Sequence, residues 1–519
     1  MSRFYLTTAI DYANGDPHIG HAYERFGADA IARWHRLIGD DVHFMVGMDE
    51  HGQKVQQAAE ARGITPQALV DEIAATFRST WDRLGISYDQ FIRTTDPHHR
   101  EGVAALAERI YQRNPDDLYE KEYEGWYCVG CELFKREAEI EDGRCILHPT
   151  RVLERKTERN WFFRLSKYGP FLRELNARPD FLEPESRRNE ILALIDSGLE
   201  DISVTRARLS WGIPWPRPLS TGETQVTWVW FDALPNYLTA TCFPSQNPNT
   251  RWPAQLHIVG KDITRLHAVV WPAMLQSAQL PLPEKVWGHG FALYKGDKVS
   301  KSSGVAFTLN DAIERHGPDA LRYFLLREIP WDADGSYTWE RFDERYTADL
   351  ADAFGNLASR VLAMIARYRD GAAPDGPKTE LDQAGADAVA RYDEAMGALL
   401  LHKAAAAAWD LVFAANAYVD RRAPWAQAKA KDDAGLDETL AALYRALVRL
   451  AGLTMPFLPS ASATLWKALG LGEAAGPGVW DHVRDPQCAT RKITKIPPLF
   501  PKPEKGRRRN SLTDCEVSS

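Results

Sequence analysis

Short apolar runs alternate with amphipathic segments along the first hundred residues of the chain. A largely apolar run from Phe4 to Ile10 predicts a buried strand, and it stops at Asp11. The turn-forming residues 14–17 follow it. After this turn, apolar residues recur at helical spacing, at Ile19, Tyr23, Phe26 and Ala30. The pattern predicts a strand, a tight turn and a helix in direct succession.

Further apolar runs predict the remaining strands of the same sheet. They are Val42–Val46, Val226–Asp232, Leu256–Val259 and, less sharply bounded, Phe291–Tyr294. Strands that alternate with helices form parallel sheets, and such sheets bind ligands at the carboxyl ends of their strands. We therefore expect an α/β, Rossmann-like parallel-sheet domain. The segment between Val42–Val46 and Val226–Asp232 interrupts the pattern and is expected to contain an insertion.

From residue 349 onward the pattern becomes helical. Apolar residues recur in steps of three and four, at Leu350, Phe354, Leu357, Val361, Ile365 and Tyr368. This stripe predicts a helix of an all-α bundle. A Gly/Pro linker at 371–377 precedes further helices over 384–433 and 437–455, and a basic tail follows, which we expect to be flexible.

Composition and charge narrow the class of protein. The chain has 519 residues, which suits about three domains, and its formal net charge of −8 argues against bulk attraction to nucleic acid or an anionic membrane. No stretch approaches the roughly 20 apolar residues of a spanning helix. Six cysteines in a chain of this length do not form a disulfide scaffold. We expect a protein of the reducing cytoplasm without a membrane partner.

Two histidines lie at the predicted start of the first helix. His18 and His21 are one turn apart, where backbone N–H groups and the helix dipole favour an anion. A strand, a turn and a helix start form the phosphate site of many α/β sheets. The alternative is that both histidines only cap the helix.

Four potential metal ligands occur in two pairs with equal spacing. Cys128 and Cys131 form the first pair, and Cys145 and His148 form the second. This spacing suits a tetrahedral zinc ion, and a site whose four ligands all come from protein is structural. The alternative is a set of buried thiols with a stray histidine.

Two lysines lie in a loop of serine and glycine after the last predicted strand. Lys298 and Lys301 are three residues apart, and Ser302 follows them. Such a loop can close over a triphosphate and neutralise charge that develops during transfer. Taken alone, lysines in such loops are usually only solvated.

The helical half carries a few polar and aromatic candidates. Asn356 and Arg360 are four residues apart on one flank of the apolar stripe. Trp425 follows two arginines and a proline, and it is either a core residue or a platform on which an unpaired base stacks.

Together these motifs resemble a known family. HIGH at 18–21 and KVSKS at 298–302 resemble the two signatures of class I aminoacyl-tRNA synthetases. Over about residues 3–460 the chain resembles the methionyl-tRNA synthetases specifically. The segments that carry this resemblance are AIDYANG at 9–15, MDEHG at 48–52, WFDA at 230–233, GKD at 260–262, NLASR at 356–360 and APW at 423–425.

The resemblance implies a role for each motif. The methionine pocket would consist of Ala9, Ile10, Tyr12, Trp230, Ala233, Tyr237 and His267, with Asp49 on the α-ammonium group. ATP, with Mg²⁺, would be bound by His18, Gly20, His21, Lys298, Lys301 and Ser302. One structural Zn²⁺ would be held by Cys128, Cys131, Cys145 and His148. Asn356, Arg360 and Trp425 would read the anticodon of tRNA(Met).

The implied domain organisation has six parts. They are a first catalytic half (1–114), a connective insertion with the zinc knuckle (115–225), a second catalytic half (226–325), a linking segment (326–348), a helical anticodon-binding domain (349–480) and the basic tail (481–519). The chain lacks the added C-terminal domain that dimerises longer relatives, so we expect a monomer.

Two residues depart from the family pattern, and two rival interpretations compete with it. Val299 replaces the usual methionine of the second signature, and Asp11 replaces a proline or tyrosine before Tyr12. One rival is a class I synthetase for another apolar amino acid, although those enzymes carry a far larger editing insertion. The other rival is a non-catalytic, synthetase-derived RNA-binding or zinc-scaffold protein, which should have lost a signature histidine or lysine.

Overall fold

The computed structural model describes residues 2–130, 133–135, 137–207, 209–245, 251–295, 297–298, 308–474, 476, 478–488 and 491–502. The chain divides into two compact units. The first unit consists of Met1–Pro318, Glu328–Ser336 and Leu399–His402. The second consists of Asp319–Arg327, Tyr337–Ala398 and Lys403–Ser519.

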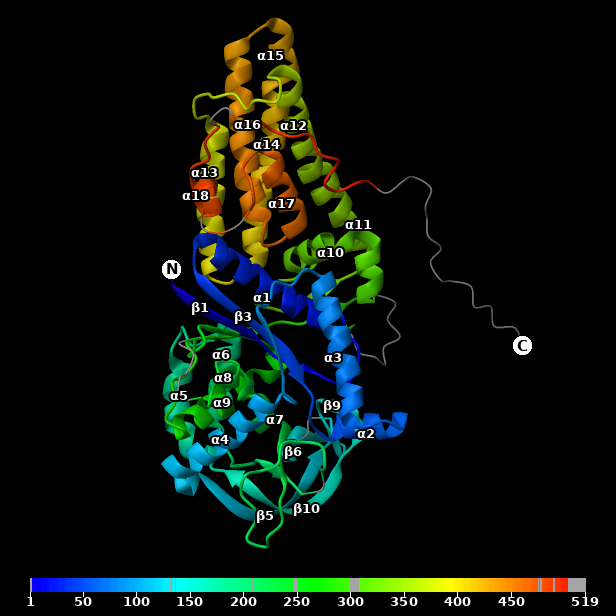
Figure 1. The fold of residues 1–519 in the computed structure, drawn as a ribbon, viewed down its shortest axis with the longest axis vertical. Coiled ribbons are helices and arrows are strands. Elements are labelled where there is room, and N and C mark those ends of the chain that lie inside the picture. Colours follow the sequence, from blue (N-terminus) through cyan, green and yellow to red (C-terminus); the bar gives the residue numbers. More distant parts are fainter. Residues whose placement is uncertain are drawn as a thin grey trace, which may run out of the picture. The chain divides into compact units, whose positions relative to one another are not determined.

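A parallel sheet lies at the centre of the first unit (Figure 1). Its order is β11-β16-β15-β1-β3-β2, and β4 also pairs with β3. The strands are β1 (Arg3–Thr8), β2 (Asp11–Tyr12), β3 (Asp41–Asp49), β4 (Gln90–Arg93), β11 (Leu182–Glu183), β15 (Leu256–Gly260) and β16 (Val286–His289). Every pairing in this sheet is parallel, which confirms the predicted fold class.

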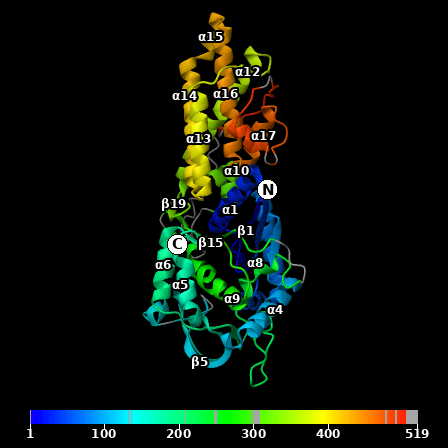
Figure 2. The ribbon, with the colours of Figure 1, turned by 90° about the vertical axis from the view of Figure 1, so that its left-hand side faces the viewer.

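Helices connect these strands, as parallel topology requires. Those of the first unit are α1 (Ile19–Ile38), α2 (Gln53–Arg62), α3 (Pro66–Arg83), α4 (Pro97–Arg113), α5 (Gly169–Ala177), α6 (Glu185–Asp196), α7 (Val229–Ala233), α8 (Asn236–Thr239) and α9 (Trp271–Ser277), together with the π-helical turn η5 (Leu266–Val270). Helix α1 packs on β1 and β3, and α5 packs on α6 (Figure 2).

An antiparallel segment interrupts the parallel sheet, as predicted. The long strands β5 (Leu118–Cys128) and β10 (Glu154–Phe163) pair along their length, and β6 (Leu133–Lys135) and β12 (Ile202–Ser203) flank them. The short strands β7 (Ile140–Glu141), β8 (Arg144–Cys145) and β9 (His148–Val152) form a separate small sheet. Strand β11 returns the chain to the main sheet before the second half begins.

Two of the predicted strands begin as expected but do not belong to the main sheet. Residues 226–232 do not continue the sheet: Val226–Thr227 (β14) pairs with β13 (Thr205–Arg206), and α7 begins at Val229. This run is rich in strand-forming side chains. In the structure it is helical, and Val229 and Phe231 are buried in the core, so tertiary packing outweighs the local preference for a strand. The last main-sheet strand is β16, whereas β17 (Ala292–Tyr294) pairs antiparallel with β18 (Asp297–Lys298).

The second unit is the predicted helical bundle. Its elements are the end of α10 (Leu309–Glu328), α11 (Trp339–Arg345), the π-helical η6 (Tyr346–Gly355), α12 (Asn356–Tyr368), α13 (Glu380–Gly397), α14 (Leu401–Arg422), α15 (Pro424–Ala430), α16 (Asp433–Thr454), α17 (Pro459–Ala468) and α18 (Gly478–Arg484). Helix α16 packs against α12, α13, α15, α17 and α18, which makes it the central helix (Figure 1).

The described part of the tail is packed on the bundle, contrary to the expected flexibility. Phe500 is buried against Tyr346 and Phe354, and the Tyr346 hydroxyl donates to the carbonyl oxygen of Pro501 at 2.7 Å. Lys502 forms an ion pair with Asp352. Among the described helices of both units, none is long and apolar enough to span a bilayer.

Candidate active site and metal centre

A cavity of about 570 Å³ opens at the carboxyl ends of the parallel strands. It is lined by all the residues expected in the methionine pocket, namely Ala9, Ile10, Tyr12, Asp49, Trp230, Ala233, Tyr237 and His267. His18, Gly20 and His21 line the same cavity. Residues from four strand ends therefore meet in one place, as the parallel topology predicts.

The two signature histidines cap helix α1 reciprocally. The Gly20 N–H donates to His18 Nδ1 at 3.1 Å, and the His18 N–H donates to His21 Nδ1 at 3.2 Å. The two rings stack with centroids 3.7 Å apart. Because each Nδ1 accepts a hydrogen bond, each neutral ring carries its proton on Nε2. The cap therefore presents two N–H donors at a helix N-terminus.

The stacked arrangement leaves little space for a side chain at Gly20. A Cβ atom there would lie 3.0 Å from His18 Cε1 and 3.1 Å from His18 Nδ1. Such a contact is tighter than most, so a side chain at residue 20 would require the His18 ring to shift by a few tenths of an ångström. The small residue between the histidines is explained by this close approach.

Tyr237 and His267, both expected in the methionine pocket, form a buried pair in the wall of the cavity. The Tyr237 hydroxyl lies 2.7 Å from His267 Nε2, and His267 Nδ1 lies 3.0 Å from the Ile263 carbonyl oxygen. Nδ1–H therefore donates to the carbonyl, and Nε2 accepts from the hydroxyl. Burial lowers the pKa of His267 to about 4, so the ring is neutral and the wall is uncharged at neutral pH.

A buried charge network that sequence reasoning did not find forms part of the cavity wall. Arg25 donates to Asp11 Oδ2 at 2.6 Å and to the Ala9 carbonyl oxygen at 2.8 Å, and it also pairs with Glu24. Glu24 Oε2 lies 3.0 Å from His289 Nε2. Burial raises the pKa of Asp11 to about 7, while Arg25 opposes that rise. The unusual Asp11 is thus the partner of a buried arginine.

Other lining residues were also missed by the sequence. Glu24 and His289 both line the cavity, and they are 265 residues apart, so no local pattern links them. Asp262 and Ile263 line it as well. The GKD motif was a signal for Asp262, because it follows a strand at a glycine bend.

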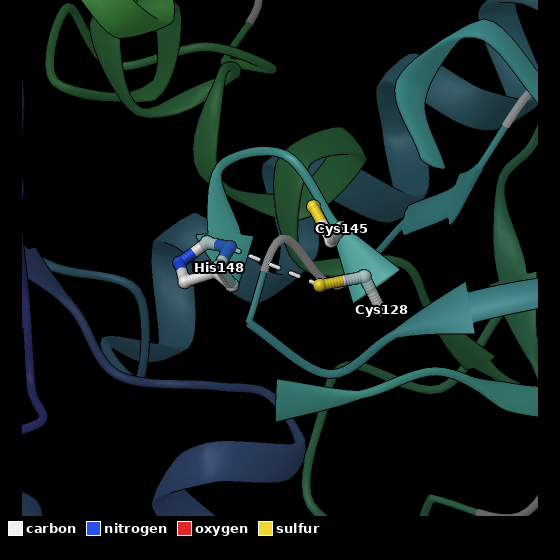
Figure 3. A group of neighbouring side chains, drawn as sticks. All are labelled: Cys128, Cys145 and His148. Atoms are coloured by element: carbon white, nitrogen blue, oxygen red, sulfur yellow. Dashed lines mark hydrogen bonds between the residues drawn. The ribbon is translucent and has the colours of Figure 1, made fainter. Parts of the chain in front are cut away.

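Three of the four expected metal ligands lie together (Figure 3). Cys128 at the end of β5, Cys145 on β8 and His148 on β9 have ligand atoms within 4.8 Å of one another, with Cys128 Sγ and His148 Nδ1 3.8 Å apart. Ligands of one tetrahedral zinc ion lie about 3.5–3.8 Å apart, so the geometry and the sulfur/imidazole donor set both fit zinc. Cys131 lies outside the described residues.

The metal cluster adjoins the cavity. Gly130 and His148 are both among its lining residues. A Cβ atom on Gly130 would lie 2.5 Å from the His148 ring, so the knuckle folds tightly around that ring. Lys54 of α2 donates to the Gly130 carbonyl oxygen at 2.5 Å and lies 5.3 Å from the Tyr12 ring centroid. Lys54 thereby connects the knuckle to Tyr12, one of the residues expected on methionine.

The second signature lies largely beyond what the structure describes. Lys301 and Ser302 are outside the described residues, as is Val299. The backbone of Lys298 belongs to β18, which pairs with β17. Ala292 of β17 lines the cavity, so the strand that pairs with Lys298 borders the cavity.

The expected anticodon residues lie on the surface of the helical unit. Asn356 is exposed and Arg360, on the same helix, pairs with Asp420 at 2.9 Å. Trp425 is 49% exposed at the start of α15, which excludes a core role. The residue before its proline, Ala423, has a φ of 45°, a left-handed conformation that is uncommon outside glycine.

Comparison with family models matches both units. A model described as class I tRNA synthetases (M) matches residues 4–151 and 135–362. A second model, described as the anticodon binding domain of methionyl tRNA ligase, matches residues 370–505.

Curated proteins and solved structures agree with these models. A methionine–tRNA ligase of Caldanaerobacter subterraneus is 42% identical over 91% of this chain and 74% of its own length. One of Streptomyces coelicolor is 39% identical over 96% of this chain and 97% of its own length. The crystal structure of the Mycobacterium tuberculosis methionyl-tRNA synthetase in complex with methionyl-adenylate is similar with a TM-score of 0.90 and 37% identity, over 97% of this chain and 100% of that one.

Proposed function

The chain belongs to the methionyl-tRNA synthetase family, and we propose that the cavity of its first unit is where L-methionine and ATP react. It is an ATP-dependent methionine–tRNA ligase, which forms methionyl-adenylate and then transfers methionine to tRNA. One observation carries the site proposal: the residues expected on methionine and the histidines expected on ATP line a single cavity.

The amino-acid half selects a long, uncharged, polarizable side chain. Trp230 and Tyr237 supply aromatic surface for a thioether, and neutral His267 holds the tyrosine hydroxyl in place. Asp49, which is 5% exposed at the end of β3, binds the α-ammonium group. A single anionic anchor fixes the orientation that apolar contacts cannot.

The nucleotide half stabilises charge on the phosphates. The Nε2–H groups of His18 and His21 donate to phosphate oxygens at the N-terminus of α1. A methionine carboxylate oxygen attacks the α-phosphorus, the new O–P bond forms, and the bond to the bridging oxygen breaks as pyrophosphate leaves. No protein nucleophile takes part, so catalysis is positioning and charge stabilisation.

Lys298, Lys301 and Ser302 complete the nucleotide half in this proposal. They would neutralise the charge that develops on pyrophosphate, with ATP entering as its Mg²⁺ complex. We expect Lys301→Ala to slow methionyl-adenylate formation about 100-fold and leave the methionine affinity within twofold. The rate is measured by stopped-flow and the affinity by equilibrium dialysis. A large loss of methionine affinity would contradict the assignment to the phosphates.

Zinc is proposed as the structural ion of the knuckle. Cys128, Cys145 and His148 would hold it together with Cys131. When bound, the ion ties three short strands that bury little apolar surface. Elemental analysis of the purified protein by mass spectrometry should give one zinc per chain.

The partners and surroundings follow from the family. The second step passes the methionyl group to the 3′ terminal ribose of tRNA(Met), whose anticodon meets Asn356, Arg360 and Trp425 in this proposal. We propose a monomer in the cytoplasm, where aminoacyl-tRNA is consumed. Sedimentation at micromolar concentration tests the monomer.

Amino-acid-dependent ATP–pyrophosphate exchange across the twenty amino acids tests the function. We expect exchange with methionine and at most weak exchange with leucine, valine or isoleucine. Exchange with one of those but not methionine would place the enzyme in another class I group. No exchange with any amino acid would favour a non-catalytic RNA-binding or scaffold role.

A further inference from the structure

The turn after β3 sends three consecutive side chains in different directions. Asp49 lines the cavity. Glu50 turns away to Arg93 at 2.6 Å and to Thr95. His51 is 1% exposed, and its Nδ1 lies 2.7 Å from Asp232 Oδ2. The last two residues therefore anchor the turn from which Asp49 projects.

Asp232 of α7 is the residue that receives the histidine. It lies on α7 between Trp230 and Ala233, which line the cavity, while Asp232 itself is fully buried and is not among the lining residues. His99 of α4 binds its second oxygen, with Nε2 3.1 Å from Oδ1. Burial would raise the pKa of Asp232, but the adjacent His51 and His99 imidazoles lower it overall. The carboxylate is thus ionised and held from two elements.

A tryptophan closes the outer side of this cluster. Trp211 is the first residue of the segment WGIPWP at 211–216, which has no role in the proposed reaction. Its Nε1–H donates to the Glu50 carbonyl oxygen at 2.6 Å, and its ring centroid lies 5.2 Å from that of His51. The backbone of the turn and the imidazole are both restrained, so the His51–Asp232 contact has little freedom to shift.

We propose that His51 and Asp232 are positioning residues that set the length of the amino-acid pocket. This inference rests on the proposed function, in which Asp49 holds the α-ammonium group of the substrate. Trp230 and Ala233 contact the substrate side chain. The His51–Asp232 hydrogen bond joins the two walls from behind, over 181 residues of sequence. The hydrogen bond therefore fixes the distance between Asp49 and the wall formed by Trp230 and Ala233. This distance distinguishes the methionine side chain from a side chain that is one methylene longer.

The test compares methionine with ethionine, which is one methylene longer. The readout is the ratio of kcat/KM for the two amino acids in pyrophosphate exchange. This ratio is independent of the fraction of folded enzyme, because both substrates meet the same preparation. One methylene is worth about 10- to 200-fold in discrimination by an apolar pocket.

We expect His51→Leu, which lacks a donor, to lower this ratio about tenfold, with the KM for methionine raised and the KM for ATP within twofold. His51→Asn, whose amide N–H replaces Nδ1–H, should restore most of the ratio. Asp232→Asn, which can no longer accept from both histidines, should behave like His51→Leu. A ratio equal to the wild-type value in both His51→Leu and Asp232→Asn would overturn the proposal, as would equal ratios in His51→Leu and His51→Asn.

Asp117→Asn is the matched control. Asp117 is also a fully buried carboxylate of the first unit, bonded to Lys167 at 2.6 Å and Ser277 at 2.7 Å, and it lies outside the cavity lining. Its variant should lose stability but keep the wild-type ratio. Asp49→Asn separates the two proposals. An unchanged KM for methionine in this variant would refute the proposed site itself. A raised KM in this variant, together with a wild-type methionine-to-ethionine ratio in the His51 variants, would refute only the length-setting role.

Discussion

Burial decides the chemical state of His267 more than any neighbouring charge does. A ring that is wholly removed from water resists protonation, and its Nε2 is already occupied as an acceptor for the Tyr237 hydroxyl. The folded-state pKa of about 4 lies below the ordinary value of 6.5. Between these two values the unfolded chain binds a proton that the folded chain does not, so the free energy of unfolding falls as the pH falls through this window.

Replacing His267 should therefore weaken the dependence of the free energy of unfolding on pH. From pH 7.5 to pH 4.5 we expect wild type to lose about 2 kcal/mol more of its free energy of unfolding than His267→Gln loses. Urea titrations at the two pH values measure it. His98→Gln, at an exposed histidine of α4, should keep the wild-type slope. Parallel pH dependence in wild type and His267→Gln would contradict a buried neutral ring.

Among the elements, helix α1 combines a structural and a chemical task in one cap. Histidine is an unusual N-cap, but His18 Nδ1 accepts the Gly20 N–H in the same way as the oxygen of serine or asparagine does. In this tautomer the proton lies on Nε2, and the proposed function has this Nε2–H donate to a phosphate oxygen. In the proposed function, stability and phosphate binding thus depend on different nitrogens of His18.

Two substitutions separate these tasks. His18→Ala should cost about 1 kcal/mol of stability and lower the exchange rate about 100-fold, because both nitrogens are lost. His18→Asn should recover the stability, since asparagine is a strong N-cap, but not the exchange rate. Thermal unfolding and pyrophosphate exchange are the two measurements. Wild-type exchange in His18→Asn would show that the imidazole is needed only as a cap.

At the scale of the whole molecule, the proposed function assigns methionine and ATP to one compact unit and the tRNA anticodon to the other. The cavity and the metal cluster belong to the first unit, whereas Asn356, Arg360 and Trp425 belong to the second. In the proposed function, adenylate formation needs only the residues of the cavity, while tRNA charging needs both units. Variants in the second unit should therefore affect the two half-reactions differently.

Trp425→Ala tests this division. We expect kcat/KM for tRNA to fall about tenfold or more, since stacking of a base on an aromatic ring contributes about 1–3 kcal/mol, while pyrophosphate exchange stays within twofold. Aminoacylation and exchange assays on one preparation compare the two. Phe413→Ala, at an aromatic of α14 with 52% exposure, controls for loss of apolar surface. An equal decrease in both half-reactions would assign Trp425 a general structural role.

The sequence by itself determined the features that arise from near neighbours along the chain. The strand, turn and helix from Arg3 to Ile38 were predicted because their signals lie within a few residues of one another. The same holds for the paired spacing of Cys128, Cys145 and His148 and for the stripe of α12.

Only the tertiary structure decided what depends on distant partners. Residues 229–233 have strand-forming side chains, yet they form α7 because the surrounding core buries Val229 and Phe231 in that conformation. The Glu24–His289 and His51–Asp232 pairs join residues 265 and 181 positions apart. Burial of a polar group is favourable only when a partner meets it, and for these groups the partner is supplied by the packing of the whole first unit.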